Sequence, residues 1–301
     1  MNPSAPDADP TTLIKTHYTS HIRSQSASSD PHNKAVASAF GYTPHDLASI
    51  PSTSNLGVSC GNPLARAGLK EGETLLDLGC GGGLDCFLAS PRVGKTGRVV
   101  GVDMTASMLE LAERNRKLGG YGNVEFLNAN ITSLPLPSGT ADIITSNCTI
   151  NLVPHAQKPV VFQETFRLLR PGGRLAVSDI LAKRDFPEEL RNDVGLYVGC
   201  VVGASEVREY EKWLREAGYE DIFIIDTEKD LNVYKEVGIL DMTDGNTDEG
   251  DTRLPEETQT GCCGVTKSTE DRRQTSSDRL ADVDLNEYVG AYQIFAIKPD
   301  A

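Results

Sequence analysis

Residues 74–86 read TLLDLGCGGGLDC, and the organisation of the chain can be worked out from this stretch. Thr74–Leu78 is a short apolar run with one acid, Asp77, which is typical of a buried parallel strand. A glycine-rich run, 79–83, follows at once, and a helical pattern begins at Leu84. A strand, a glycine turn and a helix in this order expose backbone N–H groups at the positive end of a helix. The stretch therefore predicts a site for a nucleotide-like ligand.

A second strand, Arg98–Val102, ends on Asp103, and a carboxylate there can accept hydrogen bonds from both ribose hydroxyls of an adenosine group. The glycine spacing differs from the G-x-G-x-x-G of dinucleotide-binding enzymes, and no G-x-x-x-x-G-K-[ST] loop for a nucleoside triphosphate occurs in the chain. The ligand is therefore expected to be another adenosine compound.

The stretch resembles motif I of the class I S-adenosylmethionine (SAM) methyltransferases, D/E-x-G-x-G-x-G. Its four fixed positions are matched here by Asp77, Gly79, Gly81 and Gly83. The resemblance implies that the glycine backbone passes close to the methionine part of SAM and that Asp103 binds the ribose. Met104, Asn130 and Ile131 are further candidate SAM contacts, the last two for the adenine.

Strands and helices alternate regularly after the glycine run, which implies a parallel sheet covered on both faces. We expect the fold to be α/β, a doubly wound, mostly parallel seven-stranded sheet of the Rossmann-like class I methyltransferase type, with N-terminal and C-terminal additions. The later strands are expected at Val124–Leu127, Ala141–Ser146, Arg174–Asp179, Asp221–Asp226 and Tyr288–Lys298. Helices are expected from Thr105 to Leu118 and at Pro159–Leu169, Pro187–Tyr197 and Ala204–Ala217.

Three regions are expected along the 301 residues. Residues 1–34 form a mobile segment that could hold a short helix, Leu13–Ile22; residues 35–182 form the SAM-binding core; and residues 183–301 complete the acceptor site. Between Asp241 and Leu285 there are 12 acids and 5 bases, a surplus of −7 in a chain of net charge −14. This composition predicts a disordered acidic insertion at about 242–285.

The overall charge of −14 argues against nucleic acid or an anionic membrane as the main partner. No apolar run approaches 18 residues, and the N-terminal MNPSAPDADP lacks the pattern of a secretion signal, so we expect a cytoplasmic protein. Seven cysteines in such a protein are expected to serve reactivity, metal binding or burial rather than a disulfide framework.

The cysteines differ in their surroundings. Cys80 and Cys86 are expected to be small core residues. Cys60 lies in a loop between small residues that could leave its thiol uncovered. Cys148 follows the fourth strand, at the edge of the sheet where ligands bind, and Cys200 lies between two helices. For Cys148 and Cys200, packing and function remain equally open on this reasoning alone.

Three separated thiols could hold one soft ion, although their spacing is unlike that of a zinc site. SNLGVSCGNP, LLDLGCGGGLDCFLA, GVDMT, SNCTINL, RLLRPGGRLAVSDI and LYVGCVVGA together resemble the arsenite methyltransferases. The resemblance implies that Cys60, Cys148 and Cys200 bind trivalent arsenic as thiolates and are the catalytic residues. It also implies SAM as methyl donor, arsenite or its glutathione complex as substrate, and glutathione or thioredoxin as reductant. The arsenic lone pair would attack the SAM methyl group, so no general base is expected.

Two other functions stay open: a methyltransferase for a small organic acceptor, and a non-catalytic arsenite-binding protein. The segment before Cys60 lacks the additional cysteines that members of the resembling family often carry, so the number of methylations is left undecided. Cys262 and Cys263 are candidate accessory thiols, which could capture arsenite or resolve a disulfide after methyl transfer. Because the surrounding acids disfavour thiolate, capture is the preferred role.

Overall fold

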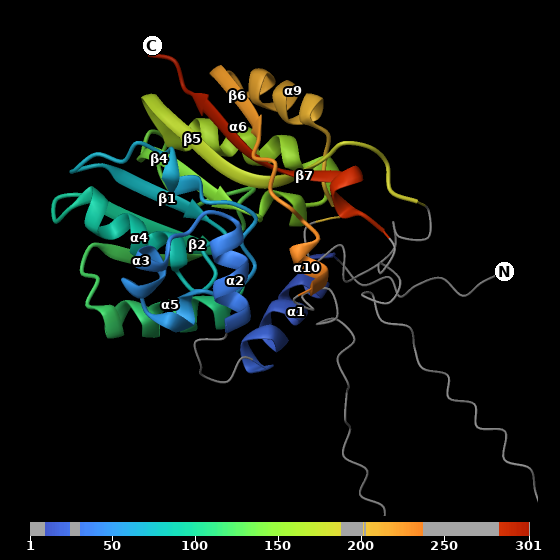
Figure 1. The fold of residues 1–301 in the computed structure, drawn as a ribbon. Coiled ribbons are helices and arrows are strands. Elements are labelled where there is room, and N and C mark those ends of the chain that lie inside the picture. The colour runs from blue at the N-terminus through green and yellow to red at the C-terminus, as the bar shows by residue number, and fades with distance from the viewer. Residues whose placement is uncertain (1–9, 25–30, 188–200, 202, 237–282, 301) are drawn as a thin grey trace, which may run out of the picture.

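A seven-stranded sheet with helices on both faces organises the computed structural model (Figure 1). The structure describes residues 10–24, 31–187, 201, 203–236 and 283–300. The strand order is β3-β2-β1-β4-β5-β7-β6. The strands are β1 (Thr74–Leu78), β2 (Arg98–Asp103), β3 (Val124–Asn128), β4 (Ala141–Asn147), β5 (Leu169–Ala182), β6 (Glu220–Asp226) and β7 (Val289–Ile297). Strands β1 to β5 run parallel to one another, and β7 is antiparallel to both β5 and β6. The expected doubly wound fold is confirmed.

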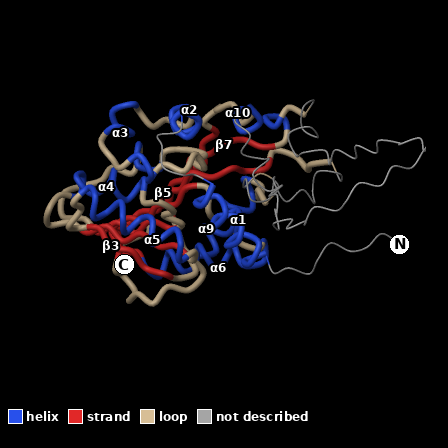
Figure 2. Tube along the Cα trace, turned by 90° about the horizontal axis from the view of Figure 1, so that it is seen from below, coloured by secondary structure: helices blue, strands red, loops and turns tan. Residues whose placement is uncertain are grey.

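The helices form two layers and a group near the carboxyl ends of the parallel strands (Figures 1 and 2). They are α1 (Pro10–Ser24), α2 (Pro31–Ala39), α3 (Pro44–Ala48), α4 (Leu84–Val93), α5 (Ala106–Gly119), α6 (Lys158–Leu168), α9 (Val207–Ala217) and α10 (Val233–Glu236). No helix among the described residues is long and apolar enough to cross a membrane.

Alternation along β1 shows how the sequence builds both layers. Leu76 and Leu78 pack with residues of α6 and α9 on one face, whereas Leu75 packs with residues of α4 on the other. Successive strand side chains point to opposite faces, so a strand that is apolar at nearly every position must be covered twice. The glycine run and the ends of β2 and β4 are then left at one open edge.

The structure differs from the sequence expectations at several ends of elements. Leu118 is 78% exposed, so the buried face of α5 is shorter than its pattern indicated. β5 begins at Leu169, before the Pro171-Gly172-Gly173 turn that was expected to precede the strand. Its extra residues pair with β4 across a register shift between Ala141 and Ile143.

The N-terminal segment is more ordered than expected. α1 extends beyond the expected Leu13–Ile22 at both ends, and Ile14 on it is buried in a cluster with Cys60 and Cys148. Thr19 on α1 shares a hydrogen bond of 3.1 Å with Ser107 on α5. This part of residues 1–34 therefore packs against the core.

Two expectations for the C-terminal region fall on residues 188–200 and 237–282, outside the described part of the chain. They are the helix Pro187–Tyr197 and most of the acidic insertion at 242–285. The end of that insertion is corrected, because Leu285 is fully buried in the cluster below the sheet edge.

Candidate active site

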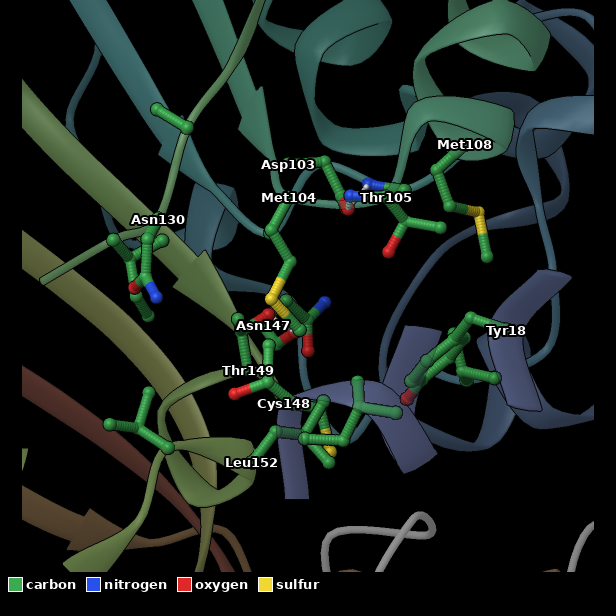
Figure 3. Close-up of a pocket in the computed structure, with 18 of the residues that line it drawn as sticks. Tyr18, Asp103, Met104, Thr105, Met108, Asn130, Asn147, Cys148, Thr149 and Leu152 are labelled. Carbon is green, nitrogen blue, oxygen red and sulfur yellow. Dashed lines mark hydrogen bonds between the residues drawn. The ribbon is translucent and has the colours of Figure 1, made fainter. Parts of the chain in front are cut away.

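A cavity of about 110 Å³ opens at the carboxyl ends of β1, β2 and β4, and α1 lies across it (Figure 3). Asp103 and Met108 lie on one side of it, Cys148 and Leu152 on the opposite side, and Tyr18 of α1 borders a third side. Six of the sequence-predicted SAM contacts line the cavity: Gly79, Gly81, Asp103, Met104, Asn130 and Ile131.

The glycine turn has the close contacts that its composition indicated. Gly79 has a φ of +74°, and a Cβ there would lie 2.1 Å from Oγ1 of Thr149. Gly83 contributes to packing instead of lining the cavity: it starts α4 with a φ of +93°, and its Cβ would meet the ring of Phe87 at 2.5 Å. Side chains at these positions would push the turn away from the sheet.

Asp103 is oriented by the turn itself. One carboxylate oxygen accepts a 3.1 Å hydrogen bond from the backbone N–H of Gly81, and the other accepts one of 2.8 Å from that of Thr105. Burial raises the pKa of Asp103, and these bonds oppose the rise because they favour the charged form. The carboxylate therefore faces the cavity in a fixed position.

A buried polar network lies beneath the turn. Asp77 accepts hydrogen bonds from Thr145 (2.8 Å) and from the thiol of Cys86 (3.4 Å). Asp85 accepts from the hydroxyl of Tyr42 at 2.8 Å and from the amide of Asn147 at 3.3 Å. Burial raises the pKa of Asp77 to about 6, and burial together with the charge of Asp77 raises that of Asp85 to about 7.

Asn147 connects this network to the cysteine loop. Its side-chain oxygen accepts a 3.2 Å hydrogen bond from the backbone N–H of Cys60, and its amide donates to the carbonyl of Gly61 at 2.8 Å. Gly61 must be a glycine for this approach, because a Cβ there would lie 2.5 Å from that of Ser178 on β5. The loop therefore packs directly on the sheet edge.

Cys60 and Cys148 are brought together from distant parts of the chain. The Sγ atoms of both and a carboxylate oxygen of Asp179 all lie within 4.8 Å of one another. Cys148 has a φ of +56°, a left-handed conformation that is costly for a residue with a side chain and is typical of functional sites. Cys60 is 1% exposed, so the expectation of an uncovered thiol was wrong: the loop that carries it packs on β5 and buries the sulfur.

Asp179, at the carboxyl end of β5, was not recognised as a candidate from the sequence. It is fully buried, and burial raises its pKa to about 6, with the hydroxyl of Tyr210 and the charge of Lys158 opposing the rise. Its position in the predicted strand Arg174–Asp179 could have indicated it, because that strand end meets the edge that carries Cys148.

The remaining cysteines divide into two groups. Cys80 and Cys86 are buried, as expected, and burial raises the pKa of both thiols. Cys200, Cys262 and Cys263 lie outside the described residues.

Comparison with known proteins relates this geometry to a family. Residues 69–218 match the family model of a methyltransferase domain. The arsenite methyltransferase of Halobacterium salinarum is 43% identical over 196 residues, which are 65% of this chain and 50% of that protein. The solved arsenic(III) S-adenosylmethionine methyltransferase of Chlamydomonas reinhardtii is 26% identical, with a TM-score of 0.52 over 89% of this chain and 74% of that one.

Residues 69–218 form a methyltransferase domain, and the chain is similar to the arsenite methyltransferases. The human arsenite methyltransferase is 38% identical over 154 residues, 48% of this chain and 40% of that protein. The chain thus spans about half the length, or less, of the curated arsenite methyltransferases that it matches. The methyltransferase domain at 69–218 includes the glycine turn, Asp103 and Cys148, whereas Cys60 and α1 precede it.

Proposed function

We propose that this protein transfers a methyl group from SAM to trivalent arsenic held by Cys60, Cys148 and Cys200. The observation that supports the proposal best is the meeting of Cys60 and Cys148 beside the cavity that Asp103 and the glycine turn line. Cys148 itself lines that cavity. A sulfur-bound acceptor there would lie next to the methyl donor, within the same site.

The chemistry follows from the two ligands. Trivalent arsenic is thiophilic, and three thiolates leave its lone pair exposed. When SAM is bound it supplies an electrophilic methyl group, and the lone pair forms the new As–C bond as the C–S bond of SAM breaks and S-adenosylhomocysteine leaves. The main task of the protein is to hold both reactants in line, and proximity alone gives a large rate effect.

Asn147 has a clear part in this arrangement. Its contacts hold the loop of Cys60 against the end of β4, and Cys148 is the next residue after that strand. The amide thereby fixes the distance between two sulfurs that lie 88 positions apart in the sequence. The two thiols are in this way preorganised before arsenic enters.

Small thiols complete the proposal. Methyl transfer makes the arsenic pentavalent, two thiolates would return it to the trivalent state by forming a disulfide, and glutathione or thioredoxin would then reduce that disulfide by thiol–disulfide exchange. Cys262 and Cys263 would capture arsenite from its glutathione complex, a role proposed from their sequence setting alone. Replacing both by serine should then raise the arsenite concentration that gives half the maximal rate.

The test is incubation of the purified, reduced protein with arsenite, SAM and glutathione, followed by arsenic speciation. We expect methylated arsenic from the wild type and none from Cys148→Ser or Cys200→Ser, with SAM binding intact in both. Cys60→Ser should greatly weaken the first methylation, because two thiolates hold arsenite less tightly than three.

Cys86→Ser is the matched control. It replaces another buried thiol with a hydroxyl and keeps a donor for Asp77, and Cys86 packs in a different cluster from Cys60 and Cys148. Its product pattern should equal that of the wild type. Full turnover in Cys148→Ser would instead favour a small organic acceptor, and arsenite binding without any methylated product would favour a binding protein.

A further inference from the structure

A carboxylate lies beside the two thiols of the proposed acceptor site. Among the described residues, Cys60, Cys148 and Asp179 form a group whose sulfur and oxygen atoms lie within 4.8 Å of one another, and all three side chains are buried. They come from a loop, from the residue after β4 and from the end of β5. A small ligand held by both sulfurs would therefore lie next to the Asp179 carboxylate.

Three hydrogen bonds fix the Asp179 carboxylate. Oδ1 accepts from the amide of Asn151 at 2.9 Å and from the backbone N–H of Ile180 at 3.0 Å, and Oδ2 accepts from the hydroxyl of Tyr210 at 2.9 Å. An ionised carboxylate has about four acceptor positions. The backbone N–H of Asn151 also donates to this carboxylate, so a donor in the site would share an oxygen with one of these groups.

The donors are themselves held from several elements. The ammonium group of Lys158, 1% exposed at the start of α6, donates to the side-chain oxygen of Asn151 at 3.1 Å and to the hydroxyl of Ser205 at 2.9 Å. Tyr210 belongs to α9. A buried carboxylate and a buried ammonium group joined through one amide make a fixed, charge-balanced network. The Asp179 carboxylate is therefore held in one orientation beside the two sulfurs.

The chemistry of arsenite supplies the matching donor. Arsenite is As(OH)₃ at neutral pH, and each thiol that binds forms one As–S bond, breaks one As–O bond and releases water that carries the thiol proton. After two exchanges the arsenic keeps one hydroxyl group, with its oxidation state unchanged. This hydroxyl is a hydrogen-bond donor beside a carboxylate that accepts.

We propose that Asp179 binds this remaining hydroxyl, so that inorganic arsenite is held at three points, by two sulfurs and one carboxylate, before a third thiol replaces the hydroxyl. The inference rests on the proposed function. It makes Asp179 a specificity residue: methylarsonous acid, CH₃As(OH)₂, has no hydroxyl left once two thiols have bound, and so gains nothing from the carboxylate.

The test compares two probes on one protein. Affinities of the reduced full chain for arsenite and for methylarsonous acid are measured by equilibrium dialysis with arsenic detection, in the wild type and in Asp179→Asn. A hydrogen bond to a charged group is stronger than one between neutral groups. We therefore expect arsenite to bind at least about tenfold more weakly in the variant. Methylarsonous acid should bind as it does to the wild type.

Two further variants separate specificity from folding. Tyr210→Phe removes a donor from the same carboxylate but keeps its charge, so the ratio of the two affinities should stay at the wild-type value. Asp179→Ser removes the charge with a smaller side chain and should repeat the shift of Asp179→Asn. The readout is the ratio of the two affinities, measured on the same protein preparation. An unfolded fraction would lower the binding of both probes equally and leave this ratio unchanged.

Equal losses for both probes in Asp179→Asn and Asp179→Ser would overturn the proposal and leave Asp179 a structural role. An unchanged ratio with unchanged affinities would overturn it as well. A wild type that binds neither probe would instead contradict the proposed function. A wild type that binds both and methylates arsenite, with no change of ratio in the variants, would contradict only the inference about Asp179.

Discussion

Asp103 combines two tasks in one carboxylate. It holds the backbone of Gly81 and Thr105 through its two oxygens, and it borders the cavity in which the ribose of SAM is expected to lie. The backbone N–H of Met104 and the hydroxyl of Thr105 also bond to this carboxylate, so the ribose hydroxyls would share its oxygens with these donors. Loss of the carboxylate would therefore remove the bonds to the ligand and also loosen the turn that surrounds it.

We predict that Asp103→Ala binds SAM at least about tenfold more weakly, since each hydrogen bond to a charged group contributes roughly 1.5–3 kcal/mol. Isothermal titration calorimetry measures the change. Glu125→Ala is the control, because it removes an equal charge from β3, where Glu125 is exposed and pairs with Arg98. Unchanged SAM affinity in a folded Asp103→Ala would contradict the assignment.

Individual site residues were predictable where a local motif defines them. Asp103 ends a strand after a glycine turn, and Cys148 follows another strand, so both could be placed at the sheet edge from the sequence. The position of Asp179 at a strand end could also be read from the sequence, but the contacts of Asp179 and Asn147 could not. Their significance depends on the loop of Cys60 and on Tyr210, which are close to them only in the folded chain.

At the scale of elements, α1 borders the cavity in which SAM is proposed to bind. Thr11, Ile14 and Tyr18 all face it from this helix, and the hydrogen bond between Thr19 and Ser107 ties the helix to α5. A ligand in the cavity would thus be enclosed on a side that the sheet cannot cover.

We predict that Tyr18→Ala weakens SAM binding about tenfold, or about 1.4 kcal/mol, because the ring contributes apolar contact area to the closed cavity. Stopped-flow measurement should show that most of the loss is faster dissociation. Thr16→Ala lies on the exposed side of the same helix and should bind SAM normally. Equal affinities of the two variants would show that α1 does not retain the ligand.

The strands were easier to predict from the sequence than the packing of the helices. Apolar runs such as Ala141–Ser146 are buried on both faces and could be recognised from composition. The packing of α1 could not be recognised in this way, because its apolar pattern is weak. Ile14 is buried only through a cluster with Cys60 and Phe40, which forms in the folded chain. Leu118 shows the opposite error: this apolar residue was expected on the buried face of its helix, but it is exposed.

For the whole molecule, four buried carboxylates have raised pKa values, those of Asp77, Asp85, Asp103 and Asp179. Burial raises the pKa of Asp77 to about 6, that of Asp85 to about 7 and that of Asp179 to about 6. The unfolded chain loses these protons near pH 4. The folded protein therefore binds more protons than the unfolded chain between about pH 4 and 7, and its stability falls as the pH rises through this range.

We predict that the melting temperature of the ligand-free protein decreases from pH 5 to pH 8, and that Asp85→Asn shows a smaller decrease. The stability that neutral Asp85 contributes is present at low pH and is lost as the pH rises through about 7. Circular dichroism melts at the two pH values measure the effect. Glu113→Gln should keep the wild-type slope, because its pKa is lowered beside Arg116 and it stays ionised throughout. A wild-type slope in Asp85→Asn would contradict the prediction.

The position of β7 has a consequence for the order in which the chain can fold. β6 pairs only with β7 among the described strands, and β7 lies between β5 and β6 although it comes last along the chain. During synthesis, β6 emerges from the ribosome with no strand to pair with, while the edge of β5 stays open. Domains begin to fold from the N-terminal side as they are made. The parallel half of the sheet can assemble early, but the half beside α9 must wait for residues 289–297, and until then β5 and β6 present two unpaired edges to other chains.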